Sequence, residues 1–319
     1  MVTLRDKMKD EFVNLHLHTH YSVQDSTIKV PELFYKIKQL GQKAVAVTDH
    51  GSIEGWNDFY LLGQDTQIKP IFGCEFYCKD QYIQPSDKTR YHLVVLAKND
   101  NGIKTINKLQ YESVKHRYYK PLLPYPFLFE NTDDIFISTA CALGTIGQCY
   151  DREKLSKKPE DAEPFLNQLL DVFGKENVAL EFQFHPQFPY QGILNSHLLD
   201  LWNIVDMKYC IATTDAHFID NPDARRKLQA DAWNKPYDST KPSLKSNCVG
   251  TSDLVRQFAK ESNFPSEKMV NTMIKNTSII ANKCNVDNVN NIGGDRVLPK
   301  FNKHGEFKKI FLRKPKKVI

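Results

Sequence analysis

Apolar and polar residues follow two different periods along roughly the first 220 residues, and these periods predict alternating strands and helices. Short apolar runs are typical of buried strands, whereas apolar positions three and four residues apart indicate helices. The predicted strands cover residues 12–20, 43–50, 70–77, 91–97, 134–139, 177–183 and 209–215. The predicted helices cover residues 31–41, 56–62, 102–114, 163–173 and 193–205. This alternation favours a parallel sheet or a βα barrel.

The first predicted strand places two histidines on one face. Successive side chains of a strand point to opposite faces, so His16 and His18 share a face while Leu15 and Leu17 fill the other. Two imidazoles in this spacing can bind one metal ion. A single pair of this kind is weak evidence, because half-buried strands also carry histidines for ordinary packing reasons.

Other residues of metal-ligand type lie at or near the ends of most of the other predicted strands. They are Asp49, His50, Glu75, Cys141, Gln183, His185, Asp215 and His217. In βα barrels the reactive side chains gather at the carboxyl ends of the strands. Unpaired charges are rarely buried, so core packing does not explain the set. Mixed imidazole, carboxylate and thiolate groups favour Zn²⁺ or Mn²⁺, and their number predicts a multinuclear cluster. His92 lies near the start of its strand, where spacing alone does not explain it.

Seven stretches of the chain resemble, in order, the motifs of the PHP (polymerase and histidinol phosphatase) domain. Within that superfamily they resemble the amino-terminal region of bacterial DNA polymerase III alpha subunits. The stretches are residues 12–25, AVTDHG at 46–51, GCEFY at 73–77, 91–99, 138–148, LEFQFHP at 180–186 and ATTDAHF at 212–218. The resemblance implies a distorted (βα)7 TIM-like barrel with two or three divalent ions, Zn or Mn, at its carboxyl end.

The resemblance also implies a set of metal ligands. They are His16, His18, Asp25, His50, Glu75, His92, Cys141, Asp215 and His217. All nine positions hold ligand-type residues, whereas many polymerase relatives have lost several. Ala140 stands where relatives have a Gly before the cysteine, and this departure removes no ligand.

Hydrolysis of a phosphate ester is the chemistry that fits such a cluster. Clustered cations lower the pKa of a bound water and neutralise the phosphoryl oxygens. We expect Asp215 and Glu75 to anchor or bridge ions, and His217 or His185 to hydrogen-bond the phosphate or protonate the leaving group. The resemblance implies a DNA 3′ end as substrate, and therefore a proofreading-type 3′→5′ exonuclease in replication or repair. A DNA polymerase or another replisome subunit is the expected partner.

Two other functions fit the same residues. One is a non-catalytic structural module, or the amino-terminal piece of a divided polymerase. The other is a small-molecule phosphatase of the histidinol-phosphatase type, against which the linker-like region beyond residue 223 argues. No palm-type catalytic carboxylates follow residue 300, so we expect that this chain does not polymerise DNA by itself.

Three segments are predicted from these patterns. The barrel covers residues 1–222, a helical region resembling the connection to the polymerase palm covers 223–300, and a basic tail covers 301–319. Residues 300–317 hold eight Lys or Arg against one Glu, a net charge of +7 that exceeds the +5 of the whole chain and leaves the other residues slightly acidic in sum. Such a tail is more often a solvated end, but its interleaved phenylalanines could stack on bases. The candidate nucleic-acid contacts are Lys308, Lys309, Arg313, Lys314, Lys316 and Lys317.

The cysteines and the hydropathy indicate the compartment. Seven cysteines form an odd set without the spacing of a small disulfide protein, which favours reduced thiols in the cytoplasm. No apolar run approaches the length of a membrane span, and the first residues do not resemble a signal peptide. We therefore expect no membrane partner.

Overall fold

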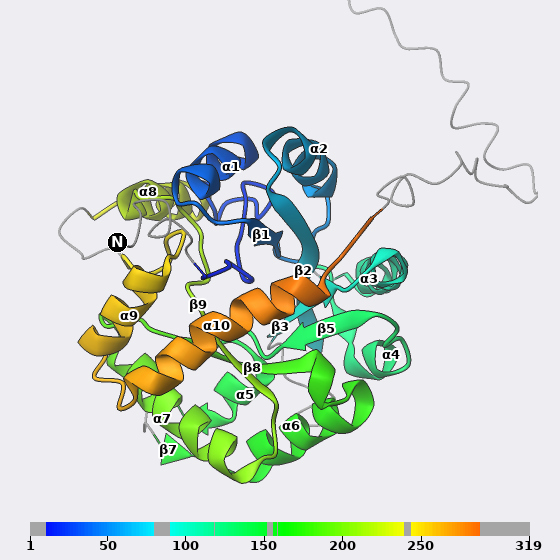
Figure 1. Cartoon of the computed structure of the whole chain (residues 1–319), viewed down its shortest axis with the longest axis vertical. Coiled ribbons are helices and arrows are strands. Elements are labelled where there is room, and N and C mark those ends of the chain that lie inside the picture. The colour runs from blue at the N-terminus through cyan, green and yellow to red at the C-terminus, as the bar shows by residue number, and fades with distance from the viewer. Residues whose placement is uncertain are drawn as a thin grey trace, which may run out of the picture.

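A curled sheet surrounded by helices forms the centre of the protein (Figure 1). The computed structural model describes residues 11–79, 90–117, 119–151, 156–157, 159–238 and 244–287. The strands of the main sheet are β1 (Ala44–Val47), β2 (Lys69–Lys79), β3 (Tyr91–Ala97), β4 (Leu123–Pro124), β5 (Ile135–Ser138), β8 (Val178–Gln183) and β9 (Tyr209–Thr213). They follow the order β1-β2-β3-β5-β8-β9, with β4 beside β2. Two further short strands, β6 (Tyr150–Asp151) and β7 (Ser156–Lys157), pair with each other.

The helices lie close to where the sequence predicts them. Those that surround the sheet are α1 (Val30–Gln39), α2 (Trp56–Thr66), α3 (Asp100–Lys115), α4 (Tyr125–Phe129), α5 (Thr145–Gln148), α6 (Pro159–Phe173), α7 (Pro189–Ile204) and α8 (Pro222–Ala232). Two more follow, α9 (Ser252–Glu261) and α10 (Glu267–Lys283), and a 3₁₀ turn covers Lys175–Asn177. None of the helices in the described part of the chain is long and apolar enough to cross a membrane.

The segment at residues 12–18 joins the two edges of the curled sheet. The backbone N–H of Ala46, in β1, donates to the carbonyl of Asn14 at 2.9 Å. On the other side, the N–H of His18 donates to the carbonyl of Ala216, just after β9, at 2.8 Å. The segment is not a regular strand, because its ladder is reduced to a single bridge between Leu17 and Ala216. It nevertheless closes the sheet into the distorted barrel that the resemblance implies.

The sheet is mixed rather than wholly parallel. β3 runs antiparallel to both of its neighbours, β2 and β5, whereas the pairs β1–β2, β5–β8 and β8–β9 are parallel. A parallel connection needs a crossover of a dozen or more residues, usually with a helix. Only residues 80–90 separate β2 from β3, and that length suits an antiparallel return.

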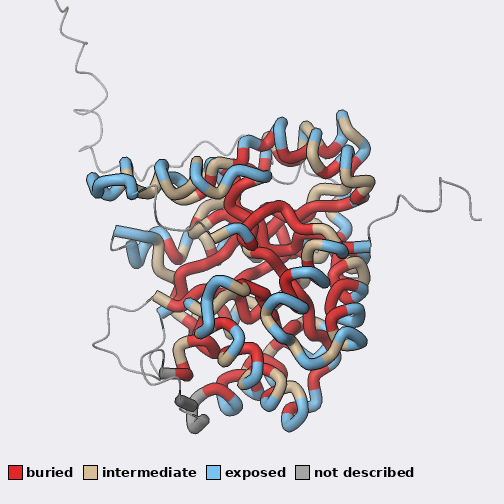
Figure 2. Tube along the Cα trace, turned by 90° about the vertical axis from the view of Figure 1, so that its left-hand side faces the viewer, coloured by how far each residue is buried: buried red, intermediate tan, exposed pale blue. Residues whose placement is uncertain are grey.

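Apolar side chains fill the barrel in two layers, and buried residues occupy its interior (Figure 2). Outward-facing residues such as Leu180 and Phe182 pack under the surrounding helices. A second cluster of buried side chains includes Leu15, Ile211 of β9 and Ile280 of α10. Figure 1 shows α10 running across one end of the barrel. The amino-terminal end is therefore filled and covered, which leaves the carboxyl end for polar side chains.

α10 is tied to the barrel by polar contacts as well. The Asn276 side-chain amide donates to the carbonyl of Cys210 at 2.8 Å, and the N–H of Val13 donates to Oγ1 of Thr277 at 2.9 Å. The helices after residue 222 thus pack on the barrel as far as Lys283. The predicted boundaries at 222 and 300 stay predictions, and the basic tail lies outside the described residues.

Candidate metal centre

His16 and His18 direct their Nε2 atoms toward one another and toward two carboxylates. The two Nε2 atoms lie 3.2 Å apart. Each lies 3.2 Å from Oδ1 of Asp215, and that of His16 lies 3.2 Å from Oε1 of Glu75. A tetrahedral ion with bonds of about 2.0 Å needs ligand atoms roughly 3.3 Å apart. These nitrogen and oxygen atoms therefore have the spacing of one coordination sphere.

Glu75 extends the site to a second group of side chains. Its Oε2 lies 2.7 Å from Nδ1 of His50, and its Oε1 lies 2.9 Å from Nδ1 of His92. Sγ of Cys141 lies 3.6 Å from the same nitrogen of His92. The carboxylate of Glu75 thus faces imidazoles on both of its oxygens, as a bridging carboxylate does.

The antiparallel direction of β3 explains the position of His92. His92 is the second residue of β3 and pairs with Tyr77 near the end of β2. Because β3 runs opposite to β2, its beginning lies at the edge of the sheet where β2 ends. A residue near the start of β3 therefore reaches the same cluster as residues that follow the parallel strands.

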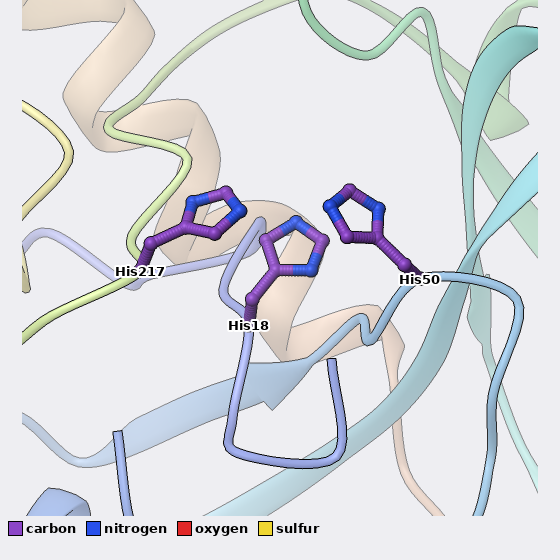
Figure 3. A group of neighbouring side chains, drawn as sticks. All are labelled: His18, His50 and His217. Atoms are coloured by element: carbon purple, nitrogen blue, oxygen red, sulfur yellow. The ribbon is translucent and has the colours of Figure 1, made fainter. Parts of the chain in front are cut away.

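Asp25 and His217 form the outer part of the cluster. His18, His50 and His217 stand side by side (Figure 3), with the ring centroid of His18 4.1 Å from that of His50 and 4.2 Å from that of His217. Oδ2 of Asp25 lies 3.1 Å from Nε2 of His50 and 3.3 Å from Nε2 of His217. Its Oδ1 accepts a hydrogen bond of 2.9 Å from Arg225 of α8.

Among the described residues, several buried polar atoms that lack a hydrogen bond gather at this place. They include Nδ1 of His50, Oε2 of Glu75, Oδ1 of Asp215 and Nε2 of His217. Burying such atoms without a partner is costly, so an orphaned group in a folded protein calls for an explanation. Nitrogen, oxygen and sulfur donors aimed at a common region fit divalent transition ions. The residues present therefore fit a metal centre.

The electrostatics of the cluster favour cations. Burial raises the pKa of Glu75, but the imidazoles of His92, His16 and His50 outweigh it and hold that pKa well below its usual range. Burial likewise raises the pKa of Asp215, and His16 and His217 reverse the shift. Both carboxylates are therefore ionised near neutral pH and available as anionic ligands for metal ions.

One side of the cluster is open to solvent. The side chains of His16, His18 and Glu75 are 1% exposed or less, whereas those of Asp215 and Asp25 are 15% and 27% exposed. Asp25 and Asp215 therefore form the more exposed side of the cluster, while the inner side chains are shielded from solvent.

All nine side chains that the resemblance implies as ligands lie together at this end of the barrel. Their role as ligands stays a prediction. His185 lies apart from the converging atoms, with Nδ1 2.6 Å from Oγ of Ser246 and Nε2 3.1 Å from Oε1 of Gln183. Burial lowers the pKa of His185 to about 4, so its ring is neutral at pH 7. The six basic residues predicted to contact nucleic acid lie outside the described residues.

Two buried acids, Glu181 and Asp49, support the histidines, and neither belongs to the ligand set that the resemblance implies. Oε1 of Glu181 lies 2.7 Å from Nδ1 of His16. Asp49 accepts a hydrogen bond of 2.7 Å from Ser22, whose Oγ lies 3.0 Å from Nδ1 of His18. In the sequence, Glu181 stands out only as an acidic residue two positions before Gln183 on a strand that is predicted to be buried. That signal does not distinguish a metal ligand from a residue that supports one.

A model of the PHP domain family matches residues 14–185 of the chain, which is more than half of its length. The DNA polymerase III subunit alpha of Aquifex aeolicus is 35% identical over 229 residues, covering 68% of this chain and 19% of that protein. The subunit of Helicobacter pylori is 30% identical over 227 residues, covering 69% and 19%. That of Campylobacter jejuni is 28% identical over 295 residues, covering 87% and 23%. The chain thus spans about a fifth of the length of these relatives.

Among solved structures, a candidate metal-dependent phosphoesterase from Bifidobacterium adolescentis aligns with 80% of this chain and 96% of that chain. The two are 13% identical in sequence, and the TM-score is 0.41.

Proposed function

The chain belongs to the PHP domain family and is related to the DNA polymerase III alpha subunit, and from that premise we propose that it is a metal-dependent phosphoesterase. Its substrate is a DNA 3′ end, which it shortens as a 3′→5′ exonuclease in replication or repair. The observation that carries the proposal is the convergence of buried imidazole and carboxylate atoms at the carboxyl end of the barrel, several of which make no hydrogen bond. A structural core would not be expected to gather so many ionisable side chains at one place.

The cluster has enough donor atoms to coordinate two or three ions. His16, His18, Asp215 and Glu75 would hold the innermost one, at the spacing described above. A second ion would be bound by Glu75 together with His50, His92 and Cys141. Asp25 and His217 would bind an ion at the outer side of the cluster. We propose Zn²⁺ or Mn²⁺ because imidazole and thiolate donors are mixed with carboxylates. Such ions supply a hydroxide nucleophile near neutral pH and neutralise the charge of the phosphate.

The residues around the ions have distinct tasks in this proposal. His217 donates its Nδ1–H to the carbonyl of Asp215 at 2.7 Å, which leaves Nε2 as a lone-pair donor. That tautomer suits binding an ion better than protonating a leaving group. Arg225 and Gln229 of α8 hold Oδ1 of Asp25, so its Oδ2 faces inward. Both ring nitrogens of His185 form hydrogen bonds with other side chains, Ser246 and Gln183. A catalytic role for His185 stays a prediction.

The test is shortening of an end-labelled single-stranded oligonucleotide in the presence of Mn²⁺ or Zn²⁺. The wild-type chain should remove nucleotides stepwise from the 3′ end, and the double variant His16→Ala with Asp215→Ala should not. Bis-p-nitrophenyl phosphate and a phosphomonoester, assayed in parallel, separate a nuclease from a small-molecule phosphatase. If the wild-type chain binds several ions but cleaves none of these esters, the exonuclease proposal is wrong.

A structural role within a polymerase is the second candidate. The observation that favours it is length, because the related alpha subunits are about five times as long as the matched region. In that case the chain would bind ions and a polymerase or another replisome subunit without cleaving DNA. We place either function in the cytoplasm, since all seven cysteines are free thiols and six of them are buried.

A further inference from the structure

Glu181 occupies the inner face of β8 at the floor of the metal centre. It is 2% exposed, and alternation along the strand places Gln183 on the same face. Burying a carboxylate this deeply is costly unless hydrogen bonds satisfy it. The partners of this carboxylate therefore show what it does.

Four side chains from different parts of the barrel hold the Glu181 carboxylate. Oε2 accepts from Oγ of Ser138, in β5, at 2.5 Å. Oε1 accepts from Thr213, in β9, at 2.5 Å and from Gln183 at 2.9 Å. The remaining partner on Oε1 is Nδ1 of His16 at 2.7 Å. With three partners on Oε1 and one on Oε2, the carboxylate is fixed in place.

We propose that Glu181 is the residue that positions His16 for the innermost ion, an inference that rests on the proposed metal-dependent function. A carboxylate opposite Nδ1 keeps the proton on that nitrogen, so the lone pair of Nε2 faces Asp215 and Glu75. It also increases the electron density that the imidazole offers to an ion. Glu181 acts through His16 rather than as a ligand, because it contacts Nδ1, on the opposite side of the ring from the Nε2 that faces Asp215 and Glu75.

The neighbouring histidine has a different support, which makes the role of Glu181 specific. Nδ1 of His18 lies 3.0 Å from the hydroxyl of Ser22, and that hydroxyl donates to Asp49 at 2.7 Å. On the Nδ1 side, His16 therefore contacts a carboxylate directly, whereas His18 reaches one only through the hydroxyl of Ser22. Since His16 has direct carboxylate support, loss of Glu181 should affect the innermost ion most.

The experiment is a Co²⁺ titration of the metal-free full-length chain, followed by the visible absorption of the bound ion. Glu181→Gln keeps the shape of the side chain but lets an amide N–H face Nδ1 of His16, which would favour the tautomer that cannot bind through Nε2. We expect the affinity for one Co²⁺ per chain to fall roughly 10–100-fold and its spectrum to change. The other ions should bind as in the wild type.

Ser138→Ala is the matched control. It removes a hydrogen bond from Oε2 of the same carboxylate and leaves the contact between Oε1 and His16 in place. It should lower the thermal stability of the metal-free chain without changing the Co²⁺ affinity or spectrum. If Glu181→Gln does not fold, Glu181→Asp can replace it. The shorter side chain keeps the negative charge but places it further from His16, so the same loss of Co²⁺ affinity is expected.

The outcomes separate this inference from the function on which it rests. Wild-type affinity for every ion in Glu181→Gln, or an equal loss in Ser138→Ala, would overturn the positioning role and leave the metal centre intact. A wild-type chain that binds no Co²⁺ would overturn the metal-dependent function itself. Selective loss of one ion in the Glu181 variants, with Ser138→Ala unaffected, supports the inference.

Discussion

Two residues at the edge of the metal centre have left-handed backbone conformations. Asp215 has φ of +48° and Ala140, just before Cys141, has φ of +60°. For residues other than Gly such conformations are uncommon, and aspartate and asparagine tolerate them better than most. Each lies just after a strand, where the chain must turn sharply to aim the next side chains at the cluster. Local backbone strain of this kind is common at functional sites.

Substitutions of Asp215 can separate its charge from its backbone conformation. Asp215→Asn keeps a residue that tolerates positive φ and removes the carboxylate, so we expect bound metal and activity to be lost while the metal-free fold is retained. Asp215→Ala should lose the metal as well and cost about 1 kcal/mol more in unfolding free energy. Metal analysis and urea denaturation of the metal-free variants measure both effects. Equal stability of the two variants would contradict the role given to the backbone.

At the residue scale the sequence predicts the cluster well and its support poorly. Seven of the nine candidate ligands stand at strand ends, where histidine, carboxylate and thiol groups seldom gather for packing alone, whereas Asp25 and His92 follow only from the resemblance to the PHP domain. Glu181 could not be assigned, because its partners Ser138 and Thr213 come from strands whose inward register appears only in three dimensions. The orientation of His185 depends in the same way on Ser246, which is distant in the sequence.

At the scale of single elements, α2 ends in a way that its sequence does not favour. Its C-terminal capping residue, Gln67, is exposed and has a left-handed conformation, with φ of 59° and ψ of 27°. Helices commonly end with glycine in this conformation, since glycine has no Cβ to clash. For β3, the sequence predicts the strand but not its antiparallel direction, because apolar periodicity does not depend on how a strand runs relative to its neighbours.

Gln67→Gly should therefore stabilise the protein by about 1 kcal/mol. The matched control is Gln64→Gly, one turn earlier on the exposed face of the same helix, where glycine should instead cost about 1 kcal/mol. Chemical denaturation of the metal-free chain gives both values. If both substitutions destabilise the protein, the left-handed end of α2 is not a source of strain.

At the scale of the whole molecule, the barrel has one end closed by α10 and the other lined by buried carboxylates and histidines. Bound ions should stabilise this arrangement, because they bind only where the distant strand ends meet in the folded chain. At a free ion concentration a hundredfold above Kd, each site adds about 2.7 kcal/mol to the unfolding free energy. We expect a chelator to lower the melting temperature, and Zn²⁺ or Mn²⁺ to restore it in proportion to the logarithm of its concentration. A melting temperature independent of metal would argue against a metal centre.

The last prediction concerns charge on the scale of the whole chain. The basic tail is proposed to hold the DNA strand whose 3′ end enters the metal centre, because its positive charge exceeds the net charge of +5 of the whole chain. Replacing Lys308, Lys309, Arg313, Lys314, Lys316 and Lys317 by Gln should raise KM for an oligonucleotide and leave hydrolysis of bis-p-nitrophenyl phosphate unchanged. For a single strand, the slope of log binding constant against log salt should become shallower by about 0.7 for each phosphate that the tail no longer neutralises. An unchanged slope would mean that the tail is a solvated end, and that DNA is held by the barrel alone.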